Sequence, residues 1–209
     1  MRRVWFGFLC SLLVGISFGS NGQNLLLEVK SGYGIAHTNR LDYKFSGFVP
    51  LHMSLGGGLK NLQIGVDVMM NPLEVGHIFY DEFTEERRFI EKTKQRVYGG
   101  FLRLNTAAEP EDNAGFIAKF GMGYVDATRE VVVLESDQTY SKKKFEPTFL
   151  VNGELGVSIP FVSMGHIYFG YGFHYNKMTL KEHGIVLDDY KQFRHLILLG
   201  VNLSVDFTN

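Results

Sequence analysis

Cysteine is almost absent from this 209-residue sequence, in which Cys10 is the only one. A single cysteine excludes a disulfide framework and a zinc site built on thiolates. Proline is also scarce, with five residues, and there is no low-complexity tract, so a mainly disordered chain is excluded. The length suits one ordinary domain or one barrel and excludes two large domains.

An excess of positive charge is missing as well, because 21 Lys and Arg stand against 22 Asp and Glu. A surface without that excess cannot hold nucleic acid by counterion release, so we expect no nucleic-acid partner. The seven histidines are dispersed and show no metal-ligand spacing, so we expect no metal site and no cofactor. A strand-like segment, not a helix, follows the glycines at 56–58, which therefore do not form a phosphate cradle.

Long hydrophobic runs are limited to one, Val4 to Phe18, and its 15 residues fall short of the ~20 that span a bilayer as a helix. Arg2 and Arg3 precede this run and small residues follow it, which is the order of a secretory signal. We therefore expect residues 1–22 to be a signal peptide and residues 23–209 to form the folded domain. A helical membrane protein is excluded.

What the sequence does contain is 24 Gly, 18 Phe, 10 Tyr and a nearly continuous alternation of apolar and polar residues. Side chains of a strand point alternately to opposite faces, so this period of two predicts strands with one apolar face. Eight such segments can be traced, over residues 25–35, 49–59, 62–70, 96–105, 116–124, 149–159, 167–175 and 193–207. Ten strands would result instead if residues 73–80 and 131–134 paired as a further hairpin.

The connections between these segments alternate in length. Three are short or compact, at residues 60–61, 106–114 and 160–165, and four are long and charged, at residues 37–46, 71–95, 126–147 and 177–190. Short turns at one rim and long loops at the other are typical of an outer-membrane barrel, whose strands are even in number. Both termini are then expected at the short-turn rim.

Eight alternating strands fit two folds, a transmembrane barrel and a soluble lipid-binding calyx, which differ in the face that is inside. The apolar faces are continuous Leu, Val, Ile, Phe and Tyr, which favours contact with lipid. The opposite faces carry charges, and an eight-strand interior is just wide enough for its own side chains, so those charges must pair. The sequence predicts a lumen charge network of Glu28, Lys30, Asp67, Arg103, Lys119, Glu154 and Arg194.

The fold predicted is therefore all-β, an eight-stranded antiparallel up-and-down transmembrane β-barrel. A signal peptide, glycine-rich inward faces and a last segment that ends Leu203-Ser-Val-Asp-Phe207 resemble the small outer-membrane β-barrel family, also described as porin-like. The resemblance implies an outer membrane of the Gram-negative type, outer-membrane lipid as a partner, and Phe207 as the aromatic that the barrel-assembly machinery reads. Phe207 is followed by Thr208 and Asn209, a small departure from that family's usual ending.

Only one stretch resembles an enzyme motif. His174-Tyr175-Asn176 is similar to the His-x-Ser-Asn of outer-membrane lipid A deacylases, but the nucleophilic Ser is absent. His174 is therefore a candidate catalytic residue only for an alternative function. The main expectation is a non-enzymatic barrel with a structural or loop-mediated binding role. A lipid A deacylase-like hydrolase and a soluble lipocalin-like binder are the alternatives, and the sequence does not identify an extracellular ligand.

Overall fold

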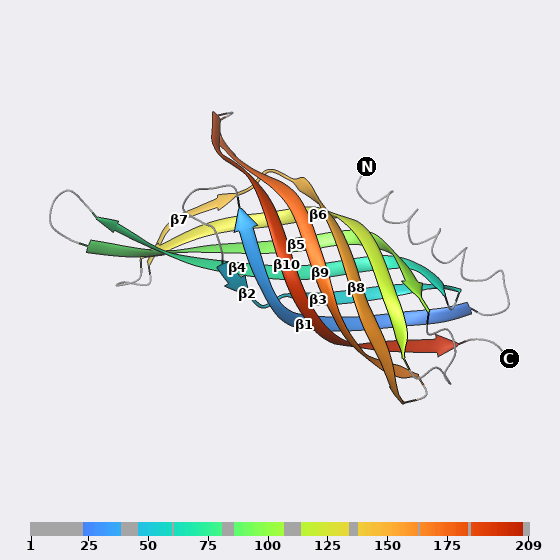
Figure 1. The fold of residues 1–209 in the computed structure, drawn as a ribbon. Helices are drawn as coiled ribbons and strands as arrows, with labels where there is room; N and C mark the ends of the chain where they lie inside the picture. The colour runs from blue at the N-terminus through green and yellow to red at the C-terminus, as the bar shows by residue number, and fades with distance from the viewer. Residues whose placement is uncertain are drawn as a thin grey trace.

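The structure, a computed structural model, is a closed sheet in which the long strands wrap around one axis (Figure 1). No helix in the described part of the chain is long and apolar enough to cross a membrane. The structure describes residues 23–38, 46–59, 61–80, 86–106, 114–133, 138–162, 164–183 and 185–206.

Eight long strands form the barrel and follow one another around it in chain order. Neighbouring strands are antiparallel, and β10 pairs with β1 to close the sheet. Two short strands, β2 (Ser46–Phe48) and β7 (Gln138–Lys144), add to β1 and β6. The barrel strands are β1 (Gln23–Thr38), β3 (Leu51–Leu59), β4 (Leu62–Tyr80), β5 (Glu86–Asn105), β6 (Gly115–Val133), β8 (Thr148–Val162), β9 (Gly165–Glu182) and β10 (Ile185–Asp206).

The predicted eight-stranded barrel is confirmed, and the alternative in which a further hairpin adds two strands to the barrel is wrong. Residues 73–80 prolong β4 and residues 131–133 prolong β6, so they do not form a separate hairpin. Much of the predicted loop at residues 71–95 is also strand, because β4 and β5 stay paired from Asn71 and Gln95 out to Tyr80 and Glu86. Charged residues interrupt the apolar–polar alternation in this segment, so the sequence pattern predicted a loop where the strands remain paired.

The two ends of the barrel differ. At one end, here called the turn rim, Asn61 belongs to a two-residue connection between β3 and β4, and Asn24 pairs with Asp206, so both chain ends of the barrel lie there. Gly58 next to this turn has φ of 143°, a conformation that favours glycine. At the opposite end, the hairpin rim, the β4–β5 and β9–β10 hairpins reach beyond the barrel (Figure 1).

The apolar face of each strand points outward, as predicted. Along β10, Ile197, Leu199 and Val201 are exposed, and they alternate with Leu196, Leu198 and Asn202, which are buried in the lumen. A similar alternation runs along the other barrel strands where their side chains are described, with an irregularity in β8, so the exposed apolar side chains form a belt suited to hydrocarbon. The lumen also contains apolar side chains, which the charged inward faces alone did not predict.

Aromatic residues border this belt toward the hairpin rim. Tyr98, Tyr124 and Phe149 are register partners across β5, β6 and β8. Tyr175 and Phe193 are partners on β9 and β10, with ring centroids 4.6 Å apart. Amphipathic rings collect at membrane interfaces, so this aromatic girdle marks the boundary of the hydrocarbon layer on the hairpin-rim side.

Leu199→Lys tests the orientation of the sheet. Leu199 is 59% exposed in the middle of the belt, so a lysine there should destabilise the barrel in lipid vesicles by about 2–4 kcal/mol. Urea unfolding of the vesicle-inserted chain measures this loss. Ile185→Lys is the matched control, because Ile185 lies at the tip of the β9–β10 hairpin, and it should be tolerated. Equal tolerance of both changes would contradict an outward lipid face.

Candidate functional site

The polar centre of the lumen is the candidate site, and six of the seven predicted network residues meet in it. They come from five strands: Glu28 and Lys30 from β1, Asp67 from β4, Arg103 from β5, Lys119 from β6 and Glu154 from β8. All six side chains are buried. Each lies on the inward face because it occupies the polar phase of the alternation that turns leucines and valines to the outside.

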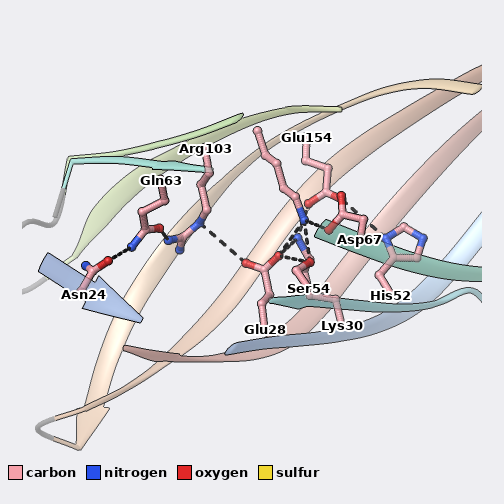
Figure 2. A network of polar contacts seen from close by, with 10 residues as sticks. Asn24, Glu28, Lys30, His52, Ser54, Gln63, Asp67, Arg103 and Glu154 are labelled. Atoms are coloured by element: carbon pink, nitrogen blue, oxygen red, sulfur yellow. Dashed lines mark hydrogen bonds and ion pairs between the residues drawn. The ribbon is translucent and has the colours of Figure 1, made fainter. Parts of the chain in front are cut away.

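Lys119 is the central donor of this network. Its Nζ lies 2.8 Å from Asp67 Oδ1, 3.1 Å from Glu28 Oε1 and 2.7 Å from Ser54 Oγ, and it thereby ties β6 to β1, β3 and β4. Lys30 bridges Glu28 of its own strand and Glu154 of β8 across the lumen. Figure 2 shows Glu28, Asp67 and Glu154 converging on one point of the interior.

Charge balance makes this burial possible. Three carboxylates and three cations share the site, so no net charge is left in the low-dielectric interior of the six-residue cluster. A buried ion pair stabilises only when its partners also satisfy one another's remaining hydrogen-bonding groups. Removing one member would therefore leave a buried charge uncompensated.

Two aromatic rings cover the lysines. Lys30 Nζ lies 4.6 Å from the ring centroid of Tyr168, and Lys119 Nζ lies 4.2 Å from that of Phe101. Such contacts are attractive because the face of the ring carries negative charge, and they strengthen where water is excluded. Each ring thus adds to the stabilisation that the carboxylates give the ammonium group.

Glycine pairs make room for both rings. Gly156 and Gly170 are cross-strand partners beside Tyr168, and a Cβ on Gly170 would lie 2.2 Å from the Tyr168 hydroxyl oxygen. Gly56 and Gly65 are partners beside Phe101, and a Cβ on Gly65 would lie 2.6 Å from its ring. The inward glycines noted in the sequence therefore have a packing role, because larger residues would displace the rings that cover the lysines.

Several polar residues that the sequence analysis did not select also belong to the network. Gln63 links Arg103 to Asn24, with 2.8 Å from Gln63 Nε2 to Asn24 Oδ1, and His52 Nδ1 lies 3.5 Å from Glu154 Oε1 (Figure 2). Asn202 fits the same network when its amide nitrogen faces Glu28, at 2.9 Å from Oε2, and its oxygen accepts from Arg103. All of them occupy the inward phase of their strands, and that phase is the signal that could have found them.

Arg194, the seventh predicted member, is buried apart from these contacts. Its guanidinium carbon lies 5.1 Å from the ring centroid of Phe48, and its Nη2 donates to Gln192 Oε1 over 2.8 Å. Position on the inward face placed Arg194 in the lumen correctly, but the stagger of the strands decides which inward residues share a level. That stagger puts Arg194 nearer the hairpin rim.

His174 also faces the lumen. It is fully buried and stacks on His52, with ring centroids 5.1 Å apart and an interplanar angle of 20°. Neither ring nitrogen of His174 has a hydrogen-bond partner among the described residues, so no Ser or Thr hydroxyl stands ready as a nucleophile. The barrel wall separates this imidazole from lipid.

Apolar side chains form two further clusters in the lumen. One cluster packs at the hairpin-rim end, and its Phe145 lies on the β7–β8 connection, where Phe145 N donates to Ala127 O of β6 and Glu146 N donates to Thr179 O of β9. A second cluster surrounds Tyr168 and Leu198. The first cluster consists of Met69, Val97, Val125, Ala127, Phe145, Leu150, Met178 and Leu180.

Other predicted features lie elsewhere. The proposed signal peptide, residues 1–22, and the assembly residue Phe207 are outside the described residues. Within the described ranges, no group of three or more His, Cys, Asp or Glu is placed to hold a metal ion.

Lys119→Met tests the ion network. The change leaves Asp67 without its cation and removes one partner of Glu28, so it should cost about 3–5 kcal/mol of unfolding free energy in urea titrations. Adding Asp67→Leu restores the charge balance and should recover much of the loss. Lys143→Met, in the exposed Lys143–Glu182 pair, is the control and should have little effect. A Lys119→Met variant as stable as this control would argue against a buried network.

The chain is similar to known proteins in fold and not in sequence. No protein-family model and no curated protein sequence matches the chain. Among solved structures, Neisserial surface protein A is similar with a TM-score of 0.55 at 12% identity, over 86% of this chain and 96% of that chain. The chain has the fold of a small outer-membrane β-barrel. Its apolar belt faces outward, as this fold requires of a barrel in a lipid bilayer.

More distant likenesses include Ail of Yersinia pestis, with a TM-score of 0.45 at 13% identity over 89% of this chain and all of that chain. OprG of Pseudomonas aeruginosa has a TM-score of 0.45 at 12% identity, over 90% of this chain and 98% of that chain.

Proposed function

We propose that this outer-membrane β-barrel is a non-enzymatic, non-conducting scaffold whose role is structural or depends on its extracellular hairpins. The filled lumen is the observation that carries the proposal. Ion pairs run across it from β1 to β8 and from β6 to β4, and apolar side chains pack at the hairpin-rim end. An eight-stranded barrel has no space beyond that occupied by these side chains, so diffusion of solutes through it is disfavoured.

The two alternatives from the sequence fit the geometry less well. A lipid A deacylase would need His174 beside a nucleophile at the lipid interface, but this histidine is sealed in the lumen against His52. A lipocalin-like binder would gather its apolar side chains around a central ligand, whereas here Leu155 is 61% exposed and Phe169 58% exposed on the outer wall. The outward belt excludes that calyx.

The hairpins are built as ordered extensions of the barrel. Beyond the Asn71–Gln95 pair, β4 and β5 continue for nine further register pairs, from Pro72–Lys94 to Tyr80–Glu86. The β9–β10 hairpin continues to the Ile185–Glu182 pair, and β7 adds to the outer end of β6. Function concentrates on connections held by a rigid scaffold, and these hairpins occupy that position.

Ion pairs join the hairpins above the belt. Lys143 Nζ of β7 lies 2.6 Å from Glu182 Oε2 of β9, and Lys181 Nζ lies 2.9 Å from Glu146 Oε2. The hydrogen bond from Lys143 lowers the pKa of Glu182, and the hydrogen bond from Lys177 lowers that of Asp189. Both carboxylates therefore stay charged at neutral pH, and the pairs hold neighbouring hairpins together as one surface.

Electrical recording tests the closed lumen. The purified, folded chain reconstituted in a planar bilayer should give no stepwise conductance, because the ion network and the apolar clusters fill its interior. Heat-modifiable gel migration of the same preparation verifies that the barrel is folded. Regular conductance steps whose frequency rises with the amount of folded protein would refute the non-conducting scaffold.

Cysteine labelling tests which rim faces outward, and the near absence of native cysteine makes it clean. Ile185→Cys at the hairpin rim should react with a membrane-impermeant maleimide on intact cells. Asn61→Cys at the turn rim should react only after the cells are opened, and the unsubstituted chain gives the background. The opposite pattern would place the hairpins in the periplasm and contradict a surface role.

A further inference from the structure

A cluster of positive charge lies on the outer wall immediately beyond the aromatic girdle. It is formed by Lys92, Lys94 and Arg96 on β5 and by Lys142 and Lys144 on β7, and is called here the basic patch. On β5 the patch residues alternate with the buried Thr93, Gln95 and Val97, so they continue the outward phase of Tyr98.

The register brings the patch together across three neighbouring strands. Lys94 pairs with Thr128 of β6, and Thr128 pairs with Lys144. One step farther from the membrane, Glu130 of β6 stands between Lys92 and Lys142. Bases on β5 and β7 thus flank β6 on both sides.

Acidic residues on the patch do not balance it. In the described register, Asp126 and Glu130 of β6 and Glu74 of β4, the partner of Lys92, are three acids against the five bases of the patch. Asp126 Oδ1 lies 2.7 Å from Lys144 Nζ, and Glu130 Oε2 lies 4.0 Å from Lys94 Nζ. The patch therefore carries a net positive charge, and the Lys94 and Lys144 side chains are 67% and 62% exposed.

The height of the patch identifies what it meets. Arg96 precedes Tyr98 by two residues on β5, and its register partner Asp126 follows Tyr124 by two residues on β6. Tyr98, Tyr124 and Phe149 mark the edge of the hydrocarbon directly below. Outward side chains one step above that edge project into the headgroup layer, where the anionic groups of lipids are phosphates.

We infer that the basic patch binds the phosphate groups of lipid headgroups in the outer leaflet. Lys and Arg form charge-assisted hydrogen bonds with phosphate oxygens, and bases on two strands can hold two phosphates of one headgroup or of neighbouring headgroups. The lipid's acyl chains would lie along the apolar belt beneath Tyr98 and Tyr124. The patch thus recognises a phosphorylated lipid and not a free anion, because the two contact surfaces adjoin.

The wall formed by β9 and β10 supplies a contrast at the same rim. Lys177 Nζ lies 2.9 Å from Asp189 Oδ2, and Lys181 Nζ lies 2.9 Å from Glu146 Oε2. Lys191 is the register partner of Lys177. This wall has three lysines, two of them in close ion pairs. Replacing these three lysines removes the same number of charges from the hairpin rim outside the basic patch and is therefore the control.

Binding of lipid A to the folded full chain in non-ionic detergent micelles tests the inference. Bisphosphorylated lipid A and the same lipid A after phosphatase treatment are the two probes, and native mass spectrometry measures occupancy. Wild type should prefer the phosphorylated probe. The triple variant Lys94→Gln, Arg96→Gln, Lys142→Gln should bind it more weakly, by roughly five-fold for each charge and on the order of 100-fold in all. The control triple variant Lys177→Gln, Lys181→Gln, Lys191→Gln should retain most of the affinity.

Three results would overturn the inference. They are equal binding of the two probes by wild type, equal losses in the patch and control variants, and complete displacement of lipid A by millimolar inorganic phosphate. The last result would indicate a site for a soluble anion. If the patch variant fails to show heat-modifiable migration, the single variants Arg96→Gln and Lys142→Gln replace it, each with an expected loss of roughly five-fold.

Discussion

A sheet in hydrocarbon must leave no backbone hydrogen-bonding group unpaired, and the rest of this molecule depends on that constraint. Pairing of β10 with β1 removes both edges of the sheet and, with eight long strands, fixes a narrow lumen. Every inward side chain then competes for the same small volume without bulk water. Charges in that volume are tolerated only in neutral, mutually bonded groups, as in the cluster around Lys119 and Glu28.

The packing of the glycines, aromatic rings and lysines in the lumen is interdependent. Cross-strand glycines at 56 and 65, and at 156 and 170, create the two recesses in which Phe101 and Tyr168 lie. The rings in turn lie against the ammonium groups of Lys119 and Lys30. The high glycine content is therefore coupled to the buried charge, because a Cβ at these positions would push the rings against the network. The filled interior leaves the outer surface as the part of the barrel available for interactions.

The outer surface is divided by height into three zones. The apolar belt meets hydrocarbon, the aromatic girdle marks its boundary, and the charged outward faces of β5, β6 and β7 begin immediately above it. The hairpins then continue the same strands away from the belt, with Lys143–Glu182 and Lys181–Glu146 joining neighbouring segments. One set of strands thus carries the lipid contact, the proposed phosphate contact and the proposed extracellular platform, so their positions relative to one another are fixed by the register.

The sequence by itself determined which side chains face in and which face out, because a strand's period of two is local. That period predicted the eight strands, the outward belt and the burial of Glu28, Lys30, Asp67, Arg103, Lys119, Glu154 and Arg194. It did not predict which of these meet, since partners such as Lys119 and Asp67 are 52 residues apart. Only the tertiary structure decided that, because closure of the barrel fixes the stagger between strands. The stagger brings six of these residues to one level, leaves Arg194 beside Phe48, and seals His174 against His52.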